Sequence, residues 1–74
     1  MHIITGTQCR SFMADKNQRF GQALINSLPR QVYDEWNELN SRAMTDLFYE
    51  PDTFQAIDIA YTHFGNIFSF DWSR

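Results

Sequence analysis

The side chains with intrinsic reactivity are few, and their spacing matches no common catalytic or metal-binding pattern. The 74-residue chain has one cysteine, Cys9, and two histidines, His2 and His63. A catalytic nucleophile needs a base held beside it, and a structural zinc site needs four ligands. Neither histidine stands at a typical spacing from Cys9 or from a carboxylate. We therefore expect no catalytic residue, no metal site and no cofactor, and we expect the chain not to be an enzyme.

The charge of the chain disfavours direct binding to nucleic acid. The formal net charge is −3, and the six lysine and arginine residues are scattered along the sequence rather than clustered. Proteins that grip a phosphate backbone usually carry a basic patch. A mildly acidic surface instead suits a basic groove on another protein, including one that handles nucleic acids.

The apolar pattern predicts an all-α fold, a single small domain of three helices at about residues 11–28, 29–39 and 53–64. In the first helix, Phe20, Leu24 and Leu28 repeat at helical spacing, and Pro29 ends the run. Asp15, followed by Gln18, resembles a capping box within this segment. Gly21 costs about 1 kcal/mol relative to alanine in a helix, so we expect another helix or an aromatic ring to approach closely there, with a backbone contact to a partner as the alternative.

The second and third helices are predicted from similar signals. Trp36 belongs to an apolar stripe on the second helix, and its indole N–H should find a hydrogen-bond partner if it is buried. The pair Asn40-Ser41 predicts a turn after this helix. Asp52 is the expected N-cap of the third helix, and Gly65 its left-handed C-cap. The third helix is expected to bury one stripe, made by Phe54, Ile57, Tyr61 and Phe64.

The two ends of the chain lie outside the predicted helices, as an N-terminal arm and an extended aromatic tail. Phe68, Phe70 and Trp72 alternate, so they would share one face of an extended segment. This tail has three possible arrangements: a strand paired with Ile3-Ile4, a segment packed across the helices, or a docking peptide that adds to a partner's sheet edge.

Three groups of residues are candidates for contact with a protein partner. They are acids on the second helix, an aromatic and acidic loop, and the aromatic tail: Asp34, Glu35, Glu38, Phe48, Tyr49, Glu50, Phe68, Phe70 and Trp72. Each group has a simpler explanation. The acids would form a solvated helix face, Leu47 and Phe48 would plug the core under the helices, and the tail would pair as a strand or pack across the helices. A separate alternative is that the tail closes a homodimer.

Two segments resemble a loose group of very short proteins encoded by bacteriophages and other mobile elements. They are RFGQALIN at residues 19–26 and DLFYE at residues 46–50, within a match of roughly residues 17–64. The group has no agreed activity. By analogy, a small acidic phage protein without catalytic residues would inhibit a host machine or a defence complex such as CRISPR. The alternative is a homo-oligomeric structural or regulatory phage protein without inhibitory activity.

The expected compartment is the cytoplasm of the host cell. Residues 1–15 lack the apolar core of a signal peptide, and no apolar run approaches the roughly 20 residues that cross a bilayer. We therefore expect no membrane partner.

Overall fold

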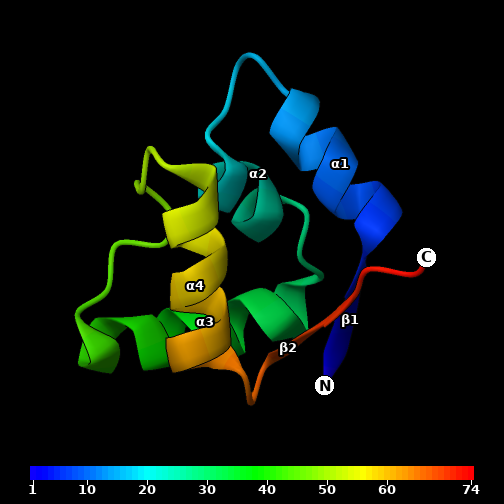
Figure 1. Ribbon diagram of the computed structural model, residues 1–74. Helices are drawn as coiled ribbons and strands as arrows, with labels where there is room; N and C mark the ends of the chain where they lie inside the picture. Colours follow the sequence, from blue (N-terminus) through cyan, green and yellow to red (C-terminus); the bar gives the residue numbers. More distant parts are fainter.

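The chain forms four helices and a pair of short strands in the computed structural model, which describes residues 1–74 (Figure 1). In chain order these elements are β1 (His2–Thr5), α1 (Gly6–Ala14), α2 (Phe20–Asn26), α3 (Arg30–Ala43), α4 (Thr53–Phe64) and β2 (Phe68–Asp71). The expected all-α fold of three helices is therefore wrong. Strands of four residues are too short to leave a clear alternating pattern, so the sequence offered pairing of the two ends only as one of three arrangements of the tail.

The first predicted helix is two helices, because polar side chains interrupt it after Ala14. Asp15 ends α1 instead of starting a helix: its backbone N–H donates to the carbonyl of Phe12. Its carboxylate then accepts the backbone N–H of Asn17 at 2.8 Å and the side-chain amide of Gln18 at 3.0 Å. Such local hydrogen bonds compete with helix continuation. The rings of Phe12 and Phe20 still meet edge to face, with centroids 6.0 Å apart, across the break.

A capping box starts α1 earlier than the apolar pattern predicted. The N–H of Gln8 donates to Thr5 Oγ1 at 3.1 Å, and the N–H of Thr5 donates to Gln8 Oε1 at 2.9 Å. Two backbone donors that lack helical partners are satisfied in this way. The Thr-x-x-Gln spacing is visible in the sequence, so this boundary was predictable.

The third helix, α3, runs through the predicted turn at Asn40-Ser41 and ends at Ala43. Ser41 bonds back to the carbonyl of Glu38 at 2.7 Å, which lets the helix accommodate it. Met44 then caps α3 in the left-handed conformation, with φ 54° and ψ 39°. A left-handed cap was instead expected at Gly65, after the helix predicted at residues 53–64. Gly65 has helical angles, with φ −61°.

The expected N-cap of α4 at Asp52 is confirmed, but the stripe of residues that α4 was expected to bury is only partly correct. Asp52 accepts the N–H groups of Phe54 and Gln55 at 2.8 and 3.0 Å. The buried residues of α4 are Ala56, Ala60 and Phe64. Phe54 is 79% exposed and Tyr61 is also exposed. Small alanines let α4 pack closely against its neighbours, which turns the larger rings toward solvent.

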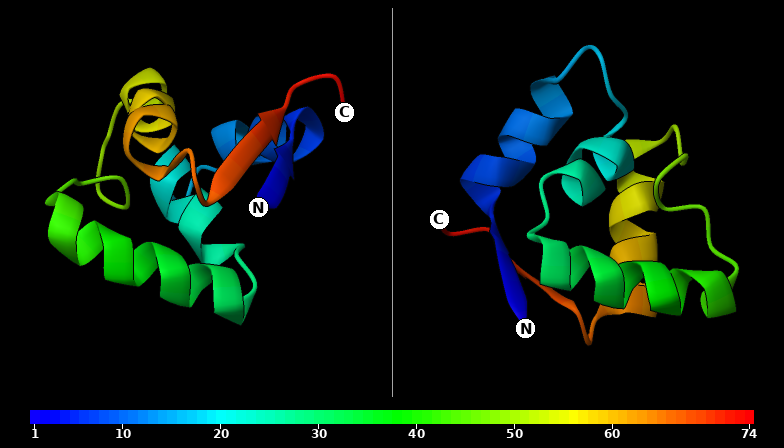
Figure 2. Two further views of the ribbon diagram at one scale, coloured as in Figure 1. Left: turned by 90° about the horizontal axis from the view of Figure 1, so that it is seen from below. Right: turned by 180° about the vertical axis from the view of Figure 1, so that it is seen from behind.

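The two strands lie side by side and join the ends of the chain (Figure 2). They pair in parallel, with His2 opposite Phe68 and Ile4 opposite Phe70. Strand pairing with Ile3-Ile4 is thus the arrangement of the tail that the structure contains. Ile4 and Phe68 are buried on the same face of this pair and pack into the core under the helices.

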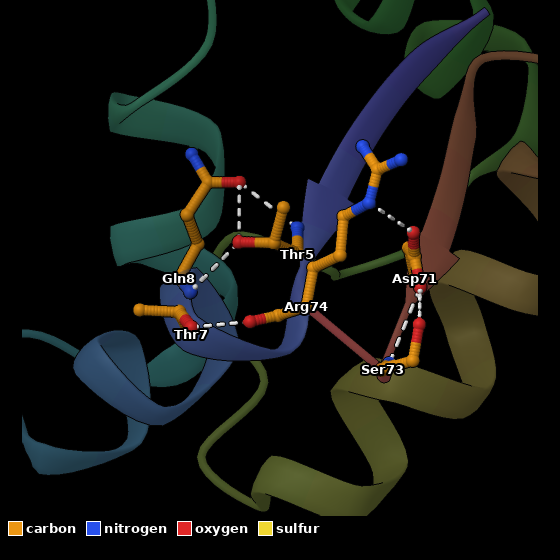
Figure 3. A network of polar contacts seen from close by, with 6 residues as sticks. All are labelled: Thr5, Thr7, Gln8, Asp71, Ser73 and Arg74. Carbon is orange, nitrogen blue, oxygen red and sulfur yellow. Dashed lines mark hydrogen bonds and ion pairs between the residues drawn. The ribbon is translucent and has the colours of Figure 1, made fainter.

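A hydrogen bond joins Arg74 to the start of α1, and further polar contacts lie within residues 71–74 (Figure 3). The hydroxyl of Thr7 donates to the backbone carbonyl of Arg74, and the Arg74 guanidinium pairs with the Asp71 carboxylate at 3.3 Å. Asp71 also accepts the Ser73 hydroxyl at 2.6 Å. This bond, together with the Ser73 N–H and Arg74, holds the pKa of Asp71 below its usual value. The last residues of the chain are therefore held to α1 by a hydrogen bond as well as by the strand pairing.

None of the four helices has the length and apolar character that crossing a membrane requires.

Candidate functional site

The main recess of the structure lies between α3 and the α3–α4 loop, defined here as residues 44–52. Its volume is about 350 Å³, near the lower end of ligand pockets, which span about 300–1,000 Å³. We call it the aromatic pocket. Four aromatic and four polar residues line it: Tyr33, Trp36, Phe48, Tyr49, Asn37, Asn40, Thr45 and Asp46.

One wall of the aromatic pocket is a single face of α3. Tyr33, Trp36, Asn37 and Asn40 stand at i, i+3, i+4 and i+7, which places them along one side of a helix. The rings of Tyr33 and Trp36 have centroids 5.7 Å apart. Trp36 is 4% exposed and also packs against Phe64 of α4, at 6.3 Å between centroids. The core thus fixes this wall.

The other wall is the α3–α4 loop, which the core also holds in place. Leu47 is fully buried, as the plug hypothesis predicted, and its backbone lies against Gly21 of α2. A Cβ on Gly21 would stand 1.9 Å from the Leu47 carbonyl oxygen. The close approach expected at Gly21 is therefore present, but loop backbone makes it. On either side of this anchor, Asp46, Phe48 and Tyr49 line the pocket.

A hydrogen bond and a ring contact complete the loop wall. Thr45 donates its hydroxyl to Asn40 Oδ1 at 2.9 Å, which joins the loop to α3. The rings of Phe48 and Tyr49 meet edge to face, with centroids 4.9 Å apart. Tyr49 is 62% exposed, whereas Phe48 is half-buried. The loop therefore presents one anchored ring and one accessible ring.

Several polar groups of the aromatic pocket have no partner within the protein. The indole N–H of Trp36 is buried and forms no hydrogen bond, contrary to the prediction that it would find one. The exposed carboxylate of Asp46 takes part in no ion pair, and none of the lining residues is basic. The pocket thus combines aromatic rings with a negative charge that the chain does not neutralise.

The acids predicted on α3 lie outside this pocket, on solvent-exposed positions of the same helix. Asp34 pairs with Arg30 at 3.2 Å, and Glu38 pairs with Arg42. Glu35 has no ion pair. Exposed pairs at this spacing contribute only a few tenths of a kcal/mol. The two ion pairs still reduce the negative charge of this helix face. Among its three acids, only Glu35 lacks a positive partner.

The remaining predicted contact residues have different surroundings. Glu50 bonds to the backbone N–H of Asp52 at 3.3 Å and does not line the aromatic pocket. Phe68 is 3% exposed and belongs to the core, so we assign it to packing and not to a contact surface. Phe70 and Trp72 stack with centroids 5.6 Å apart, and Trp72 is 42% exposed.

The tail forms a second aromatic surface, separate from the pocket. The Trp72 indole N–H donates to the Tyr61 hydroxyl at 2.8 Å, and the Tyr61 ring lies 5.0 Å from that of Phe70. The α3–α4 loop and β2 lie on opposite sides of the molecule in both figures (Figures 1 and 2). The predicted contact residues therefore divide between two surfaces instead of forming one site.

The reactive side chains are not brought together. Cys9 is fully buried in the core, and this burial raises the pKa of its thiol above the ordinary value. His63 is exposed at the end of α4. No group of three His, Cys, Asp or Glu side chains is arranged to hold a metal ion.

Sequence reasoning singled out Phe48 and Tyr49 but missed the other six residues of the aromatic pocket. The spacing of Tyr33, Trp36, Asn37 and Asn40 was available as a signal for one helix face. The predicted helix ended at residue 39 and so left out Asn40, while the apolar stripe that contains Trp36 does not include the polar Asn37. Asp46 and Thr45 join the site only through folding of the loop, which local patterns do not describe.

Comparison with protein-family models, with curated proteins and with solved structures found no match.

Proposed function

We propose that this chain acts by binding another protein, with the aromatic pocket as its principal contact. The pocket itself supports this proposal most strongly, because four aromatic side chains surround a recess of about 350 Å³ on the surface. Tyrosine and tryptophan dominate the residues that contribute most to protein–protein affinity, especially around a central pocket. The accessible ring of Tyr49 and the unpaired carboxylate of Asp46 both line this recess, so both are suited to direct contact with the partner.

The partner we propose carries a basic surface. The chain has a net charge of −3, and Asp46 and Glu35 stand without intramolecular ion pairs. Complementary charge speeds encounter and sets orientation more than it adds affinity. A basic nucleic-acid-binding surface of a host protein would meet this requirement, whereas a nucleic acid itself would be repelled. We propose no membrane partner.

The proposed consequence of binding is inhibition of a host machine or of a defence complex such as CRISPR, in the host cytoplasm. This step rests on the resemblance of residues 19–26 and 46–50 to phage-encoded segments. We also propose that the chain is not an enzyme and uses no cofactor. A molecule of 74 residues can still cover a functional groove, since a standard interface needs only about 800 Å² from each partner.

The test compares partner capture by the wild-type chain, Tyr49→Ala and Phe54→Ala from a lysate of the host bacterium. Phe54 is the matched control, because its ring is exposed and belongs to α4 and not to the aromatic pocket. We expect Tyr49→Ala to lose the captured protein and Phe54→Ala to retain it. Equal capture by all three chains would contradict the proposal. Circular dichroism of each variant checks that folding is unchanged.

Self-association is the second candidate function, and the exposed residues near β1 favour it. Met1 and Ile3 are both exposed, and β1 pairs with β2 alone in a sheet of two strands. An edge strand without a charged residue is a template for pairing with a second copy. Sedimentation equilibrium distinguishes the two functions: a dimer at micromolar concentration supports this candidate, and a monomer at millimolar concentration rejects it.

A further inference from the structure

We propose that the aromatic pocket accepts an arginine side chain of the partner as its anchor. This inference rests on the proposed function and specifies the chemistry that the same site recognises.

The rings of the aromatic pocket suit a flat cation. Tyr33 of α3 and Tyr49 of the loop both line the pocket with exposed rings, so accessible aromatic surface comes from two elements. A cation is attracted to a ring face when it lies within about 6 Å of the ring centroid. The guanidinium of arginine is planar and weakly hydrated, so it stacks on rings at a lower desolvation cost than an ammonium.

Two of the polar side chains that line the pocket, Asp46 and Asn37, suit a hydrogen-bond donor with positive charge. Asp46 carries a carboxylate that accepts hydrogen bonds and lacks an ion pair. Asn37 has no side-chain hydrogen bond within the protein, so its amide oxygen is also free to accept. A guanidinium offers five N–H donors in a fixed fork, which matches several acceptors at one site.

The absence of basic side chains from the pocket argues against an anionic occupant. None of the eight lining residues is lysine, arginine or histidine. The nearby arginines of α3, Arg30 and Arg42, are engaged by Asp34 and Glu38. A nucleotide would stack its base on the rings but leave its phosphate near Asp46 without a counter-charge. We therefore assign the pocket to a basic peptide side chain and not to a nucleotide.

The test is an NMR titration of the ¹⁵N-labelled full chain with a blocked Gly-Arg-Gly peptide. The two tryptophans provide matched probes, because Trp36 lines the aromatic pocket whereas the Trp72 indole bonds to Tyr61 on the other surface. We expect saturable shifts at the Trp36 indole N–H and at Asn37, with the Trp72 indole N–H unmoved. Comparable shifts at both indoles, or no saturation at Trp36, would overturn the proposal.

Three further ligands determine which property of arginine matters. Gly-citrulline-Gly keeps the shape but lacks the charge, and we expect it to bind at least roughly fivefold more weakly. Gly-Lys-Gly should also bind more weakly, because its ammonium is more strongly hydrated. Adenosine monophosphate should leave Trp36 unshifted. Equal affinity for citrulline or lysine, or tighter binding of the nucleotide, would each contradict an arginine site.

Two charge variants locate the contact on the protein. Asp46→Asn keeps the size of the side chain and should weaken peptide binding roughly fivefold, a typical upper effect for an exposed ion pair. Asp58→Asn removes an exposed acid from α4, outside the pocket, and should change nothing. Equally weak peptide binding by both variants would show that the peptide responds only to the net charge of the chain, and this would contradict a contact at Asp46.

The outcome is separable from that of the proposed function. If the peptide fails to bind while Tyr49→Ala still abolishes partner capture, the arginine assignment falls and the contact surface stands. If the peptide binds but Tyr49→Ala captures the partner normally, the proposed function falls instead.

Discussion

Among single residues, Gly21 has the largest effect on the aromatic pocket, because it determines where the loop wall lies. Its missing side chain lets the Leu47 carbonyl lie against α2. Glycine is a poor helix former, so its presence in α2 has a packing reason. The buried Leu47 then holds Phe48 at the pocket, which links the core to the proposed contact surface.

Replacing Gly21 with alanine should therefore destabilise the fold and disturb the aromatic pocket. The new Cβ would overlap loop backbone, which cannot rotate away as a flexible side chain could. We expect a loss of about 1–3 kcal/mol in the free energy of unfolding, as for overpacked cores, despite alanine's better helix propensity. Urea denaturation measures it. Gly65→Ala is the milder control, since a Cβ at Gly65 would stand 3.1 Å from the nearest atom outside its own neighbours, the Tyr61 carbonyl oxygen. A Gly21→Ala chain as stable as this control would refute the contact at Gly21.

Cys9 makes a separate prediction about alkaline pH. Burial raises its pKa, so the folded chain keeps the thiol proton at pH values where the unfolded chain loses it. Stability must then fall as the pH rises above about 8.5, the ordinary cysteine value, by up to about 1.4 kcal/mol per pH unit. Urea midpoints measured between pH 7 and pH 10 report this effect. Cys9→Ala should lack that part of the slope, and identical slopes would contradict the prediction.

At the element scale, α3 matters most, because one of its faces forms a pocket wall. Its continuation to Ala43 brings Asn40 into the wall and places Thr45 within reach of Asn40. The sequence predicted the start of α3 after Pro29 and the stripe that contains Trp36. It did not predict the end, because the Asn40-Ser41 signal is satisfied inside the helix and Met44 is not a typical left-handed residue.

The left-handed cap at Met44 leads to a stabilising substitution. A non-glycine residue pays about 1–2 kcal/mol in this conformation, and the Met44 side chain is 90% exposed, so little packing is at stake. Glycine also has more backbone entropy in the unfolded chain, which offsets part of this relief. We therefore expect Met44→Gly to raise the free energy of unfolding by about 0.5–1 kcal/mol. Thermal unfolding measures it. Met44→Ala keeps the unfavourable angle, so an equal gain in that variant would disprove this explanation.

At the scale of the whole molecule, the sequence predicted helical content better than architecture. The cap at Asp52 and the core positions Phe20, Leu24 and Phe64 follow from local patterns. The β1–β2 pair does not, because it joins segments from opposite ends of the chain, and only tertiary packing selects such a contact. The aromatic pocket also depends on a contact between distant residues. Its two walls belong to one stretch of sequence, but the contact of Leu47 with Gly21 sets the position of the loop wall.

The molecule also presents two aromatic surfaces on opposite sides. We propose that the partner binds at the aromatic pocket and not at the surface formed by Trp72 and Tyr61. The Trp72 and Tyr61 side chains satisfy each other through a hydrogen bond, whereas Asp46 and Trp36 retain polar groups without partners. Unpaired groups beside exposed rings favour recognition of a second molecule.

The decisive measurement of partner binding at the aromatic pocket is the dissociation constant of the captured partner for the wild-type chain, Tyr49→Ala and Phe54→Ala. A ring at the centre of a contact is worth at least about 2 kcal/mol, so the account predicts that Tyr49→Ala weakens binding tenfold or more. Phe54→Ala should bind as the wild type does. Unchanged affinity of Tyr49→Ala, or equal weakening of the two variants, would contradict the account.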